Sequence, residues 1–573
     1  MANETYYVSK STDNGFVVGN DTNDGLTLAT PFLTIDKATD TAMLATGAVT
    51  VILNDGSYVG TDIDASNQYL IIGANPAFDS LTMKPYLSTA TLVPGVATGC
   101  IRFTDTTGWD NTKTFTIQDI TLGRSETSEG GADANYQIWI VGGAATSPTY
   151  NVTRVTVKNQ AFYGVYCSGT TLANINITDH THVSTRAVGR GMLYSATHGG
   201  GKITIDGGTV NHTQWNNSGN GIVYIDAAAA GVEVEIEDLA VIGKTVSGTG
   251  LMYGIFVANV DNAVASGCSV DLENLSGGAW SVGNIRLFGN DVTLTAASQK
   301  IHSCTASAAG FDSGGFLITV GGDGGSAQAN VSDGSEIIGC TAVGDATFVA
   351  NNGHGIGVVA NDNCEMYGNT SSFADIGILS KLTTNCKVAG NLVKQCGLGG
   401  TSKVMYYNKG GTNDLFYNNT AIIDSDTDAV VFIAGIDGAT NSTGAEFDNN
   451  YIYGQADAIS QIIAINSGSD ATFDYNHYYI TGTVPNPSFT YTVTTYATVA
   501  LWIAARETNG VVVTANPFNS DYTLIEGSTG VGASPNVGLT AKAIGFNGEP
   551  YPSNAIDIGG APTTYGPFHP VNL

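Results

Sequence analysis

The chain has 573 residues, of which only 12% are charged, and 73 residues are Gly. Charged residues usually make up roughly a quarter of a protein, so Lys, Glu and Arg are too scarce here for a helical protein. The 42% of hydrophobic residues can build a core, which excludes a disordered chain, and the net charge of −29 repels nucleic acid and anionic lipid. We therefore expect an all-β protein with many turns, without nucleic acid as a partner.

The N-terminal residues 1–60 are predicted to form a strand, a turn and a capping helix. After the polar turn "GNDTNDG" (residues 19–25), the segment 31–47 begins with Pro31 and ends with Gly47, as helices often do. Within this segment the apolar residues recur at helical spacing: Phe32, Ile35, Ala38, Ala42 and Met43. A helix at this place would cover the open end of a β structure.

Calcium is the one cofactor that the sequence allows, at two acidic turns. Asn20 and Asp24 resemble the first half of a calcium loop, but Pro31 stands where such a loop needs its bidentate Glu. "DSDTD" at residues 424–428 clusters carboxylates without further ligands at a fixed spacing. Solvated turns are the favoured interpretation of both stretches, and no metal site is predicted.

An approximate repeat recurs along the chain, Φ-x-Φ-x-x-[N/C/D]-x-x-Φ, in which Φ is an apolar residue and x is any residue. Its best copies centre on Cys304, Cys340, Asn369, Asn391, Asn419, Asn450 and Asn476. Weaker upstream copies centre on Asp119, Arg154, Asn176, Gly208, Asp238 and Cys268. A second pattern follows each copy, often Gly and then an alternating apolar strand, as in "YGVYC" and "HGIGVV".

Two or three short strands in each of these copies predict a parallel β-helix of about 13 coils over residues 61–480, with coils about 4.8 Å apart. Asn at one corner is expected to form a ladder of hydrogen bonds, and Cys to fit there as a small buried group. The eight cysteines show no CxxC spacing and are expected as buried free thiols. "HTH" at His180 and His182 is interpreted as two exposed neighbours on a strand.

No signal peptide follows Met1, and no stretch approaches 18 consecutive apolar residues. We therefore expect no membrane span and no export by the usual secretory signal.

Both ends of the chain resemble one superfamily. "YYVSKSTDNGFVVGNDTNDGLTLATPFLTIDKAT" and the following "VTVILNDGSYVG" resemble the N-terminal signature of right-handed parallel β-helix proteins of the pectate-lyase-like superfamily. "FDYNHYYITG", "DYTLIEGST" and "AIDIGG" resemble its closing segments. The resemblance implies an all-β, right-handed, single-stranded parallel β-helix with an irregular C-terminal β cap over residues 481–573.

This superfamily holds polysaccharide lyases, glycoside hydrolases, phage tailspikes and non-catalytic adhesins, so the resemblance is weak for activity. Many of the lyases use a Lys or Arg base beside calcium-binding acidic residues. This chain departs from that pattern, because only Lys381, Lys387, Lys394, Lys403 and Lys409 cluster in the later coils.

Residues just before the second-pattern strands would form a column on one outer edge. The carbohydrate-binding candidates in this column are Tyr163, Arg190, Asn220, Tyr253 and His354, because sugars need flat aromatic faces and polar groups. Asp375, Asp428 and Asp457 are the catalytic candidates. Asp428 and Asp457 on adjacent coils would lie about 5 Å apart, near the carboxyl spacing of retaining glycosidases. Alternatively, Asp simply favours the turn before a strand.

Two functions remain open. The first is a virion surface protein, similar to a phage tailspike, tail fibre or decoration protein, that binds host cell-surface glycan as a homotrimer beside other virion proteins. The second is a secreted, extracellular polysaccharide lyase or retaining glycoside hydrolase. The β-helix signature begins within the first ten residues, which favours a fibre or decoration role over a tailspike with a separate attachment domain.

Overall fold

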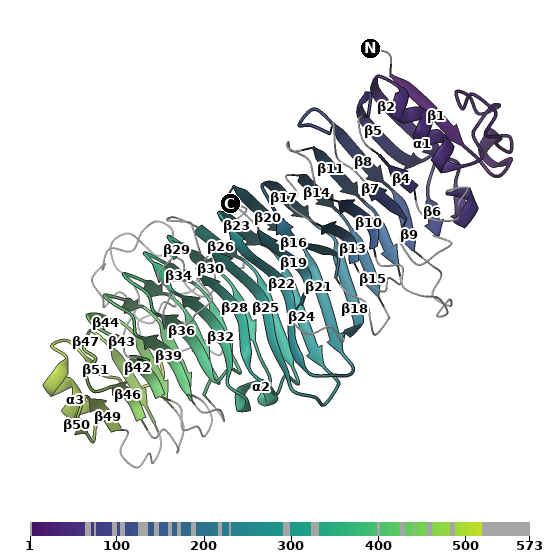
Figure 1. Ribbon diagram of the computed structural model, residues 1–573. Helices are drawn as coiled ribbons and strands as arrows, with labels where there is room; N and C mark the ends of the chain where they lie inside the picture. Colours follow the sequence, from purple (N-terminus) through teal and green to yellow (C-terminus); the bar gives the residue numbers. More distant parts are fainter. Residues whose placement is uncertain are drawn as a thin grey trace. The chain divides into compact units, whose positions relative to one another are not determined.

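The computed structural model describes residues 3–63, 70–73, 76–93, 100–103, 109–123, 136–141, 148–158, 163–168, 173–184, 191–215, 220–227, 231–289, 298–321, 332–397, 402–423, 430–438, 440–454, 461–481 and 488–517. The chain divides into an N-terminal unit, Met1–Ala263 with Cys268–Gly278, and a C-terminal unit, Val264–Gly267 with Ala279–Leu573. In both units short strands stack in parallel rows (Figure 1). We name the three rows sheets A, B and C.

In the N-terminal unit the chain visits the three sheets in turn. Sheet A contains β1 (Glu4–Val8), β2 (Gly47–Leu53), β5 (Phe78–Pro85), β8 (Thr114–Gln118), β11 (Thr149–Thr153), β14 (Asn174–Thr178), β17 (Gly201–Asp206) and β20 (Val232–Glu237). Sheet B contains β3 (Gly56–Val59), β6 (Ala90–Val93), β9 (Ile120–Gly123), β12 (Thr156–Lys158), β15 (Thr181–Ser184), β18 (Thr209–Trp215), β21 (Ala240–Thr245) and β24 (Ser269–Asn274). Sheet C contains β4 (Leu70–Ile72), β7 (Ile101–Phe103), β10 (Tyr136–Val141), β13 (Tyr163–Ser168), β16 (Leu193–His198), β19 (Asn220–Ala227) and β22 (Gly250–Val260). β23 (Asn262–Ser266) holds residues of both units.

The C-terminal unit repeats this order. Sheet A contains β26 (Ser298–His302), β30 (Glu336–Ile338), β34 (Glu365–Tyr367), β37 (Lys387–Ala389), β40 (Leu415–Tyr417), β44 (Ala445–Asp448) and β47 (Ala471–Asp474). Sheet B contains β27 (Thr305–Ala309), β31 (Thr341–Val343), β35 (Thr370–Ser372), β38 (Leu392–Lys394), β41 (Thr420–Ile423), β45 (Tyr451–Gly454), β48 (His477–Ile480) and β51 (Val511–Val512). Sheet C contains β25 (Trp280–Gly289), β28 (Gly315–Gly321), β32 (Gly353–Val359), β36 (Ile376–Lys381), β39 (Val404–Lys409), β42 (Val430–Asp437), β46 (Gln461–Ile465) and β49 (Ser488–Tyr491).

Smaller elements of the C-terminal unit are β29 (Ser332–Asp333), β33 (Asn361–Asp362), β43 (Thr440–Asn441), β50 (Thr494–Tyr496) and the helices α2 (Ala346–Ala350) and α3 (Val499–Arg506). The strands of each sheet pair in parallel, and their inward side chains stack, as Ile318, Ile356 and Ile378 do in sheet C. This arrangement confirms the predicted parallel β-helix. The predicted boundaries at residues 60 and 480 stay predictions.

The chain leaves sheet A through a corner that starts with a left-handed residue, such as Asp119 (φ 58°) or Asp238 (φ 49°). The residue after it is buried: Ile120, Val155, His180, Leu239 and Cys268 in the N-terminal unit, and Cys304, Cys340, Asn369, Asn391, Asn419, Asn450 and Asn476 in the C-terminal unit. All thirteen copies of the repeat fall at strands β8 to β47 of sheet A, and β1, β2 and β5 precede them without the repeat.

In four upstream copies of the repeat, the residue predicted for the buried corner position was wrong. Asp119, Arg154 and Asp238 are the left-handed residues, one position before the buried one. Asn176 lies inside β14, and its side-chain amide donates to Asn151 Oδ1 at 2.9 Å. The pattern favoured Asn, Cys or Asp, whereas the N-terminal unit fills three of these corners with Ile120, Val155 and Leu239.

The prediction of two exposed histidines was wrong. His180 and His182 are both 0% exposed, with ring centroids 6.4 Å apart. His180 follows the left-handed Asp179 and therefore takes the inward corner position, where burial lowers its pKa to about 4.

The predicted asparagine ladder is confirmed in the C-terminal unit. The Asn391 side-chain amide donates to Asn419 at 2.9 Å, Asn419 to Asn450 at 3.1 Å, and Asn450 to Asn476 at 3.1 Å. Six cysteines are buried free thiols, as expected. Cys364 and Cys386 form a disulfide instead, because they stack on successive coils with Cα atoms 4.6 Å apart.

Helices lie near both ends of the described chain. Helix α1 (Ile35–Leu44) starts at Thr34, whose backbone N–H and hydroxyl both donate to the Asp21 carboxylate, at 2.9 Å and 3.0 Å. The "GNDTNDG" turn thus holds the start of α1. Near residue 500, α3 buries Trp502 against Phe473 and Phe489. None of the described helices is long and apolar enough to cross a membrane.

Candidate functional site

A hollow of about 220 Å³ lies on the outer face of sheet C in the C-terminal unit, over β25, β28, β32, β36 and β39. The parallel pairing of these strands aligns their outward side chains in three lines that run across the strands. We call this surface the sheet C groove. The first line holds Phe316, His354, Ile376 and Val404. The second line holds Arg286, Thr319, Gly357, Leu379 and Tyr407, and the third holds Phe288, Gly321, Val359, Lys381 and Lys409. Ile376, Leu379 and Val404 form an apolar floor against which Phe316 and Tyr407 pack.

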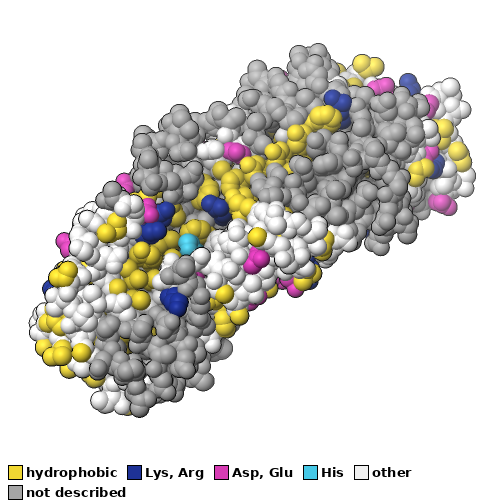
Figure 2. All heavy atoms as spheres, turned by 60° about the horizontal axis from the view of Figure 1, so that its bottom comes forward, with side chains coloured by type: hydrophobic (Ala, Val, Ile, Leu, Met, Phe, Trp, Pro, Cys, Tyr) yellow, Lys and Arg dark blue, Asp and Glu magenta, His cyan; other side chains and the backbone are white. Residues whose placement is uncertain are grey.

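Cations surround this floor. Lys381 and Lys409 are paired in register on neighbouring strands and reach the Asp437 carboxylate at 3.6 Å and 3.3 Å. The Arg286 guanidinium lies 4.3 Å from the centre of the Phe288 ring. Among the described residues of the groove, three cations and one carboxylate give a positive charge, in a protein of net charge −29. In Figure 2 hydrophobic side chains gather on this face, with Lys, Arg and His side chains among them.

His354 Nδ1 and Thr319 Oγ1 in the groove are buried and have no hydrogen-bond partner among the described residues. Burial, followed by the charges of Lys409 and Lys381, lowers the pKa of His354 to about 4, so its imidazole is neutral at pH 7. Burial and then Asp437 raise the pKa of Tyr407, which stays a neutral phenol. Buried polar atoms are normally satisfied, so these two can receive groups of a ligand.

Among the predicted site residues, His354 lines the groove. Tyr163 and Tyr253 lie on sheet C of the N-terminal unit, where they are only 1% and 8% exposed. The Tyr163 ring stacks on Tyr194 at 4.5 Å, and Tyr253 packs on Phe256 at 4.5 Å. Carbohydrate binding by these two residues stays a prediction.

Asp375 is 0% exposed and caps a loop. Its two carboxylate oxygens accept the backbone N–H groups of Lys403 at 2.8 Å and Ser402 at 3.0 Å. Burial raises its pKa. Its catalytic role stays a prediction, and the geometry is that of the turn alternative. Arg190, Asp428, Asp457 and the Asn220 side chain lie outside the described residues.

The sequence analysis noted Lys381 and Lys409 only as part of a lysine cluster and assigned neither to a site, and it missed Arg286, Tyr407 and Thr319. The sequence could have indicated Lys381 and Lys409, because the second-pattern strands "DIGILSK" and "VMYYNK" both end in Lys. The predicted column started from the residue before each strand, whereas the groove also uses residues three and five positions further along.

An aromatic ladder lies on sheet C of the N-terminal unit: Trp139, Tyr166, Tyr194, Tyr224 and Phe256. Successive rings from Tyr166 to Phe256 stack at 5.5, 5.0 and 4.9 Å with interplanar angles of 11°, 17° and 16°. Because each ring face is covered by the next ring, this row does not offer the flat faces on which sugars stack. The ladder therefore stabilises the stacked strands.

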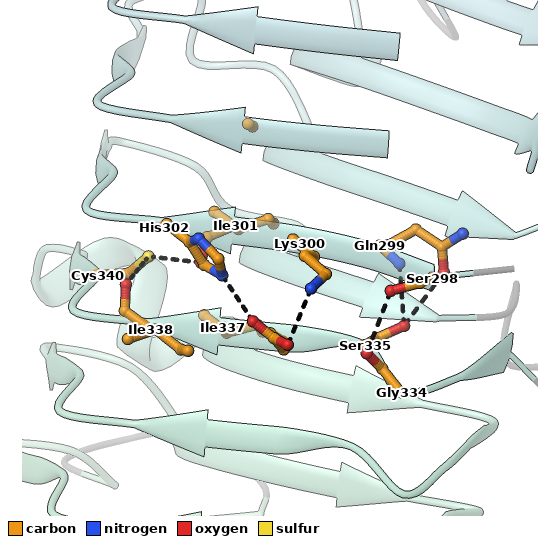
Figure 3. Close-up of polar contacts among 12 residues, drawn as sticks. Ser298, Gln299, Lys300, Ile301, His302, Gly334, Ser335, Ile337, Ile338 and Cys340 are labelled. Carbon is orange, nitrogen blue, oxygen red and sulfur yellow. Dashed lines mark hydrogen bonds and ion pairs between the residues drawn. The ribbon is translucent and has the colours of Figure 1, made fainter. Parts of the chain in front are cut away.

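A polar cluster lies on the outer face of sheet A in the C-terminal unit. Lys300 and His302 on β26 point toward β30, where both reach the Glu336 carboxylate, at 3.0 Å and 3.1 Å (Figure 3). Ser298 Oγ donates to the Gly334 carbonyl at 3.2 Å, and the Gln299 backbone N–H donates to Ser335 Oγ at 3.2 Å. These contacts tie two neighbouring coils together. No group of three or more His, Cys, Asp or Glu side chains among the described residues could hold a metal ion.

No protein-family model matches the chain, and neither does any curated protein. It is similar to a solved structure of pectate lyase Pel9A, with 12% identity and a TM-score of 0.28, over 98% of this chain and 96% of that chain. It is also similar to the GH136 lacto-N-biosidase from Eubacterium ramulus, with 9% identity and a TM-score of 0.25, over 89% of this chain and 68% of that chain. A rhamnogalacturonan lyase is similar with 13% identity and a TM-score of 0.21, over 82% of this chain and 87% of that chain.

The assignment of the fold rests on the strand order and the register in each unit. Strands of the three sheets alternate along the chain, and each strand pairs in parallel with its equivalent one coil away. The chain therefore has the parallel β-helix fold that the resemblance of its sequence implies.

Proposed function

We propose that this protein binds an acidic polysaccharide in the sheet C groove. The observation that carries the proposal is the position of Lys381 and Lys409 beside an apolar floor. This floor also presents His354 Nδ1 and Thr319 Oγ1, for which the described part of the chain supplies no hydrogen-bond partner. Aromatic and aliphatic side chains contact the carbon skeleton of a sugar, and a few polar atoms fix its hydroxyl groups.

Charge favours an acidic glycan over a neutral one. Lys381 and Lys409 are 21% and 33% exposed, so their ammonium groups can meet a ligand while they hold Asp437. Paired strands place them about 4.8 Å apart at the backbone, and both can approach one carboxylate or two successive anionic groups. A protein of net charge −29 repels polyanions elsewhere, which concentrates their binding at this positive surface.

Cleavage by β-elimination is a second candidate, and one observation favours it. His354 is neutral at pH 7 and lies on β32 of sheet C, next to β36, the strand that carries Lys381. A neutral imidazole accepts a proton, and nearby ammonium groups stabilise the negative charge that forms beside a sugar carboxylate.

The biological setting remains a separate proposal. A virion surface protein would use the groove to hold a host glycan, as a homotrimer attached to other virion proteins, whereas an extracellular enzyme would turn the glycan over. Native mass spectrometry measures the oligomeric state, and a monomer would contradict the homotrimer.

The binding experiment titrates the protein with a panel of acidic and neutral oligosaccharides by calorimetry. Lys409→Ala and Lys381→Ala are each expected to weaken the binding of acidic members about tenfold, the size of one charge-assisted hydrogen bond. Lys387→Ala is the matched control, because Lys387 pairs with Glu365 at 3.5 Å on sheet A, away from the groove. Equal loss in all three variants, or none, would overturn the proposal.

Turnover is measured on the same panel by ultraviolet absorbance of unsaturated ends. A lyase produces this absorbance, and His354→Ala abolishes it while binding of acidic oligosaccharide persists. Binding without any product identifies a glycan-binding protein that does not cleave.

A further inference from the structure

A carboxylate lies against the two lysines of the sheet C groove. Asp437 ends β42, and its two carboxylate oxygens lie 3.3 Å from Lys409 Nζ and 3.6 Å from Lys381 Nζ. Both distances are longer than the roughly 2.8 Å of a tight charge-assisted hydrogen bond. Both lysines line the hollow, whereas Asp437 is not one of the described residues that line it. Asp437 therefore acts on a ligand of the groove through the lysines.

The register of sheet C explains why this carboxylate lies beside the lysines. Lys381, Lys409 and Gly435 are aligned on β36, β39 and β42, so the line of cations ends at a residue without a side chain. A Cβ on Gly435 would come within 2.9 Å of the Tyr407 ring, so glycine leaves room for that ring. Asp437 follows two residues later and hence on the same face of β42. The strand thus replaces a third outward cation with a carboxylate.

The backbone that carries Asp437 is held in place. Strand β42 continues into an antiparallel pair with β43, in which Asp437 pairs with Thr440. The Gly435 carbonyl oxygen accepts the N–H of Gly410 at 3.2 Å and the hydroxyl of Ser442 at 2.7 Å. A carboxylate that the chain fixes beside its partners acts at a high effective concentration. A dissolved anion therefore replaces it only when the anion itself is very concentrated.

We propose that Asp437 is an internal competitor for the two lysines, which restricts the groove to oligomeric acidic glycans and excludes single anions. The inference rests on the proposed function, because it concerns the same two lysines. A single carboxylate gains at the lysines only what Asp437 gives up, so it binds weakly. An oligosaccharide also contacts the apolar floor with His354 and Thr319, which a small anion does not reach at the same time.

The first test uses Asp437→Asn, which removes the charge and keeps the shape of the side chain. Calorimetry measures the binding of trigalacturonic acid and a hyaluronan hexasaccharide, and of the monomers galacturonic acid and glucuronic acid. The variant is expected to bind the oligosaccharides about fivefold more tightly, because two partly exposed ion pairs no longer compete. It is also expected to bind the monomers, for which the unaltered chain shows no detectable binding.

Glu365→Gln is the matched control. Glu365 lies 3.5 Å from Lys387 on sheet A, so this variant also removes one negative charge beside a lysine, but away from the groove. The control is expected to bind all of these sugars as the unaltered chain does. A general effect of the net charge on polyanions would appear equally in both variants, and equal tightening would overturn the inference.

The second test needs no variant. Sodium acetate and sodium chloride are compared at equal ionic strength, which keeps screening equal, as competitors for the more tightly bound oligosaccharide. In the unaltered chain both salts are expected to weaken binding equally, because Asp437 already takes the place of a single carboxylate. Stronger competition by acetate would overturn the inference, and this result decides even where circular dichroism shows that Asp437→Asn is unfolded. In a folded Asp437→Asn, acetate is expected to weaken binding more than chloride does.

Lys409→Ala separates this inference from the proposed function. Weaker oligosaccharide binding by Lys409→Ala, without tighter binding by Asp437→Asn, would leave the proposed function standing and overturn the inference. Asp437 would then only position the lysines. Unchanged binding by Lys409→Ala, or no binding of either oligosaccharide to the unaltered chain, would contradict the proposed function, and the inference would fall with it.

Discussion

Asn419 lies in the middle of the asparagine ladder, and Asn419→Ala removes four hydrogen bonds at once. Its carbonyl oxygen accepts the backbone N–H of Asn391 at 3.1 Å and the side-chain amide of Asn391 at 2.9 Å. Its own amide donates to the Val388 carbonyl at 2.8 Å and to Asn450 at 3.1 Å. The side chain is 0% exposed, so water does not replace it.

A buried hydrogen bond contributes about 1 kcal/mol net, and an unsatisfied partner left behind costs at least as much. The variant is therefore expected to lose about 4 kcal/mol locally, which raises the local opening equilibrium about 10³-fold. In a stack of repeats this loss concentrates in the neighbouring coils.

Amide hydrogen exchange measures the effect directly, because the Asn391 N–H loses its acceptor. Asn176→Ala is the control, since it removes a similar amide bond, to Asn151 at 2.9 Å, from the partly exposed face of sheet A. The control is expected to lose no more than about 1 kcal/mol. Unchanged protection of the Asn391 N–H, or equal losses in the two variants, would refute the reasoning.

Three further predictions follow from other contacts. Lys409→Ala weakens acidic oligosaccharide binding about tenfold at low salt and less at high salt, as calorimetry at two ionic strengths would show. Burial raises the pKa of Glu507 to about 7, so its protonated form is favoured in the folded chain, and stability is full below pH about 4.5 and falls as pH rises toward about 7. The difference between this pKa and the ordinary 4.5 corresponds to about 3 kcal/mol of folding free energy. The free energy of unfolding of Glu507→Gln, measured by denaturation, should lack this pH dependence, and parallel curves of stability against pH for both proteins would contradict the prediction. Gly191→Ala places a Cβ 1.7 Å from the Ile222 carbonyl oxygen and is expected to cost more than about 3 kcal/mol. Gly73→Ala meets no atom of the described residues within 4 Å and is expected to stay within about 0.5 kcal/mol, and equal melting temperatures would exclude this difference.

Local features of the sequence determined much of the fold. Alternating apolar residues predict strands, and Asn or Cys marks the inward corner in the C-terminal unit. Helical spacing within residues 31–47 predicts the first helix, but its bounds were too wide, because α1 spans Ile35–Leu44 with Thr34 as its N-cap. These signals depend on neighbours in the chain, so one sequence contains them. The N-terminal corners were misplaced because apolar residues there carry no mark that separates a corner from a strand.

The candidate site depended on tertiary structure. His354 was predicted from its place before a strand, but Arg286, Lys381 and Asp437 meet near it only because several coils stack in one register. Loops of different length separate these coils, so spacing along the sequence does not reveal which residues share a row. The same stacking pairs Cys364 with Cys386 and turns His180 inward. Sequence periodicity determined that strands form and which corner they share, whereas inter-coil register decided which side chains meet, because register is set by packing between residues far apart in the chain.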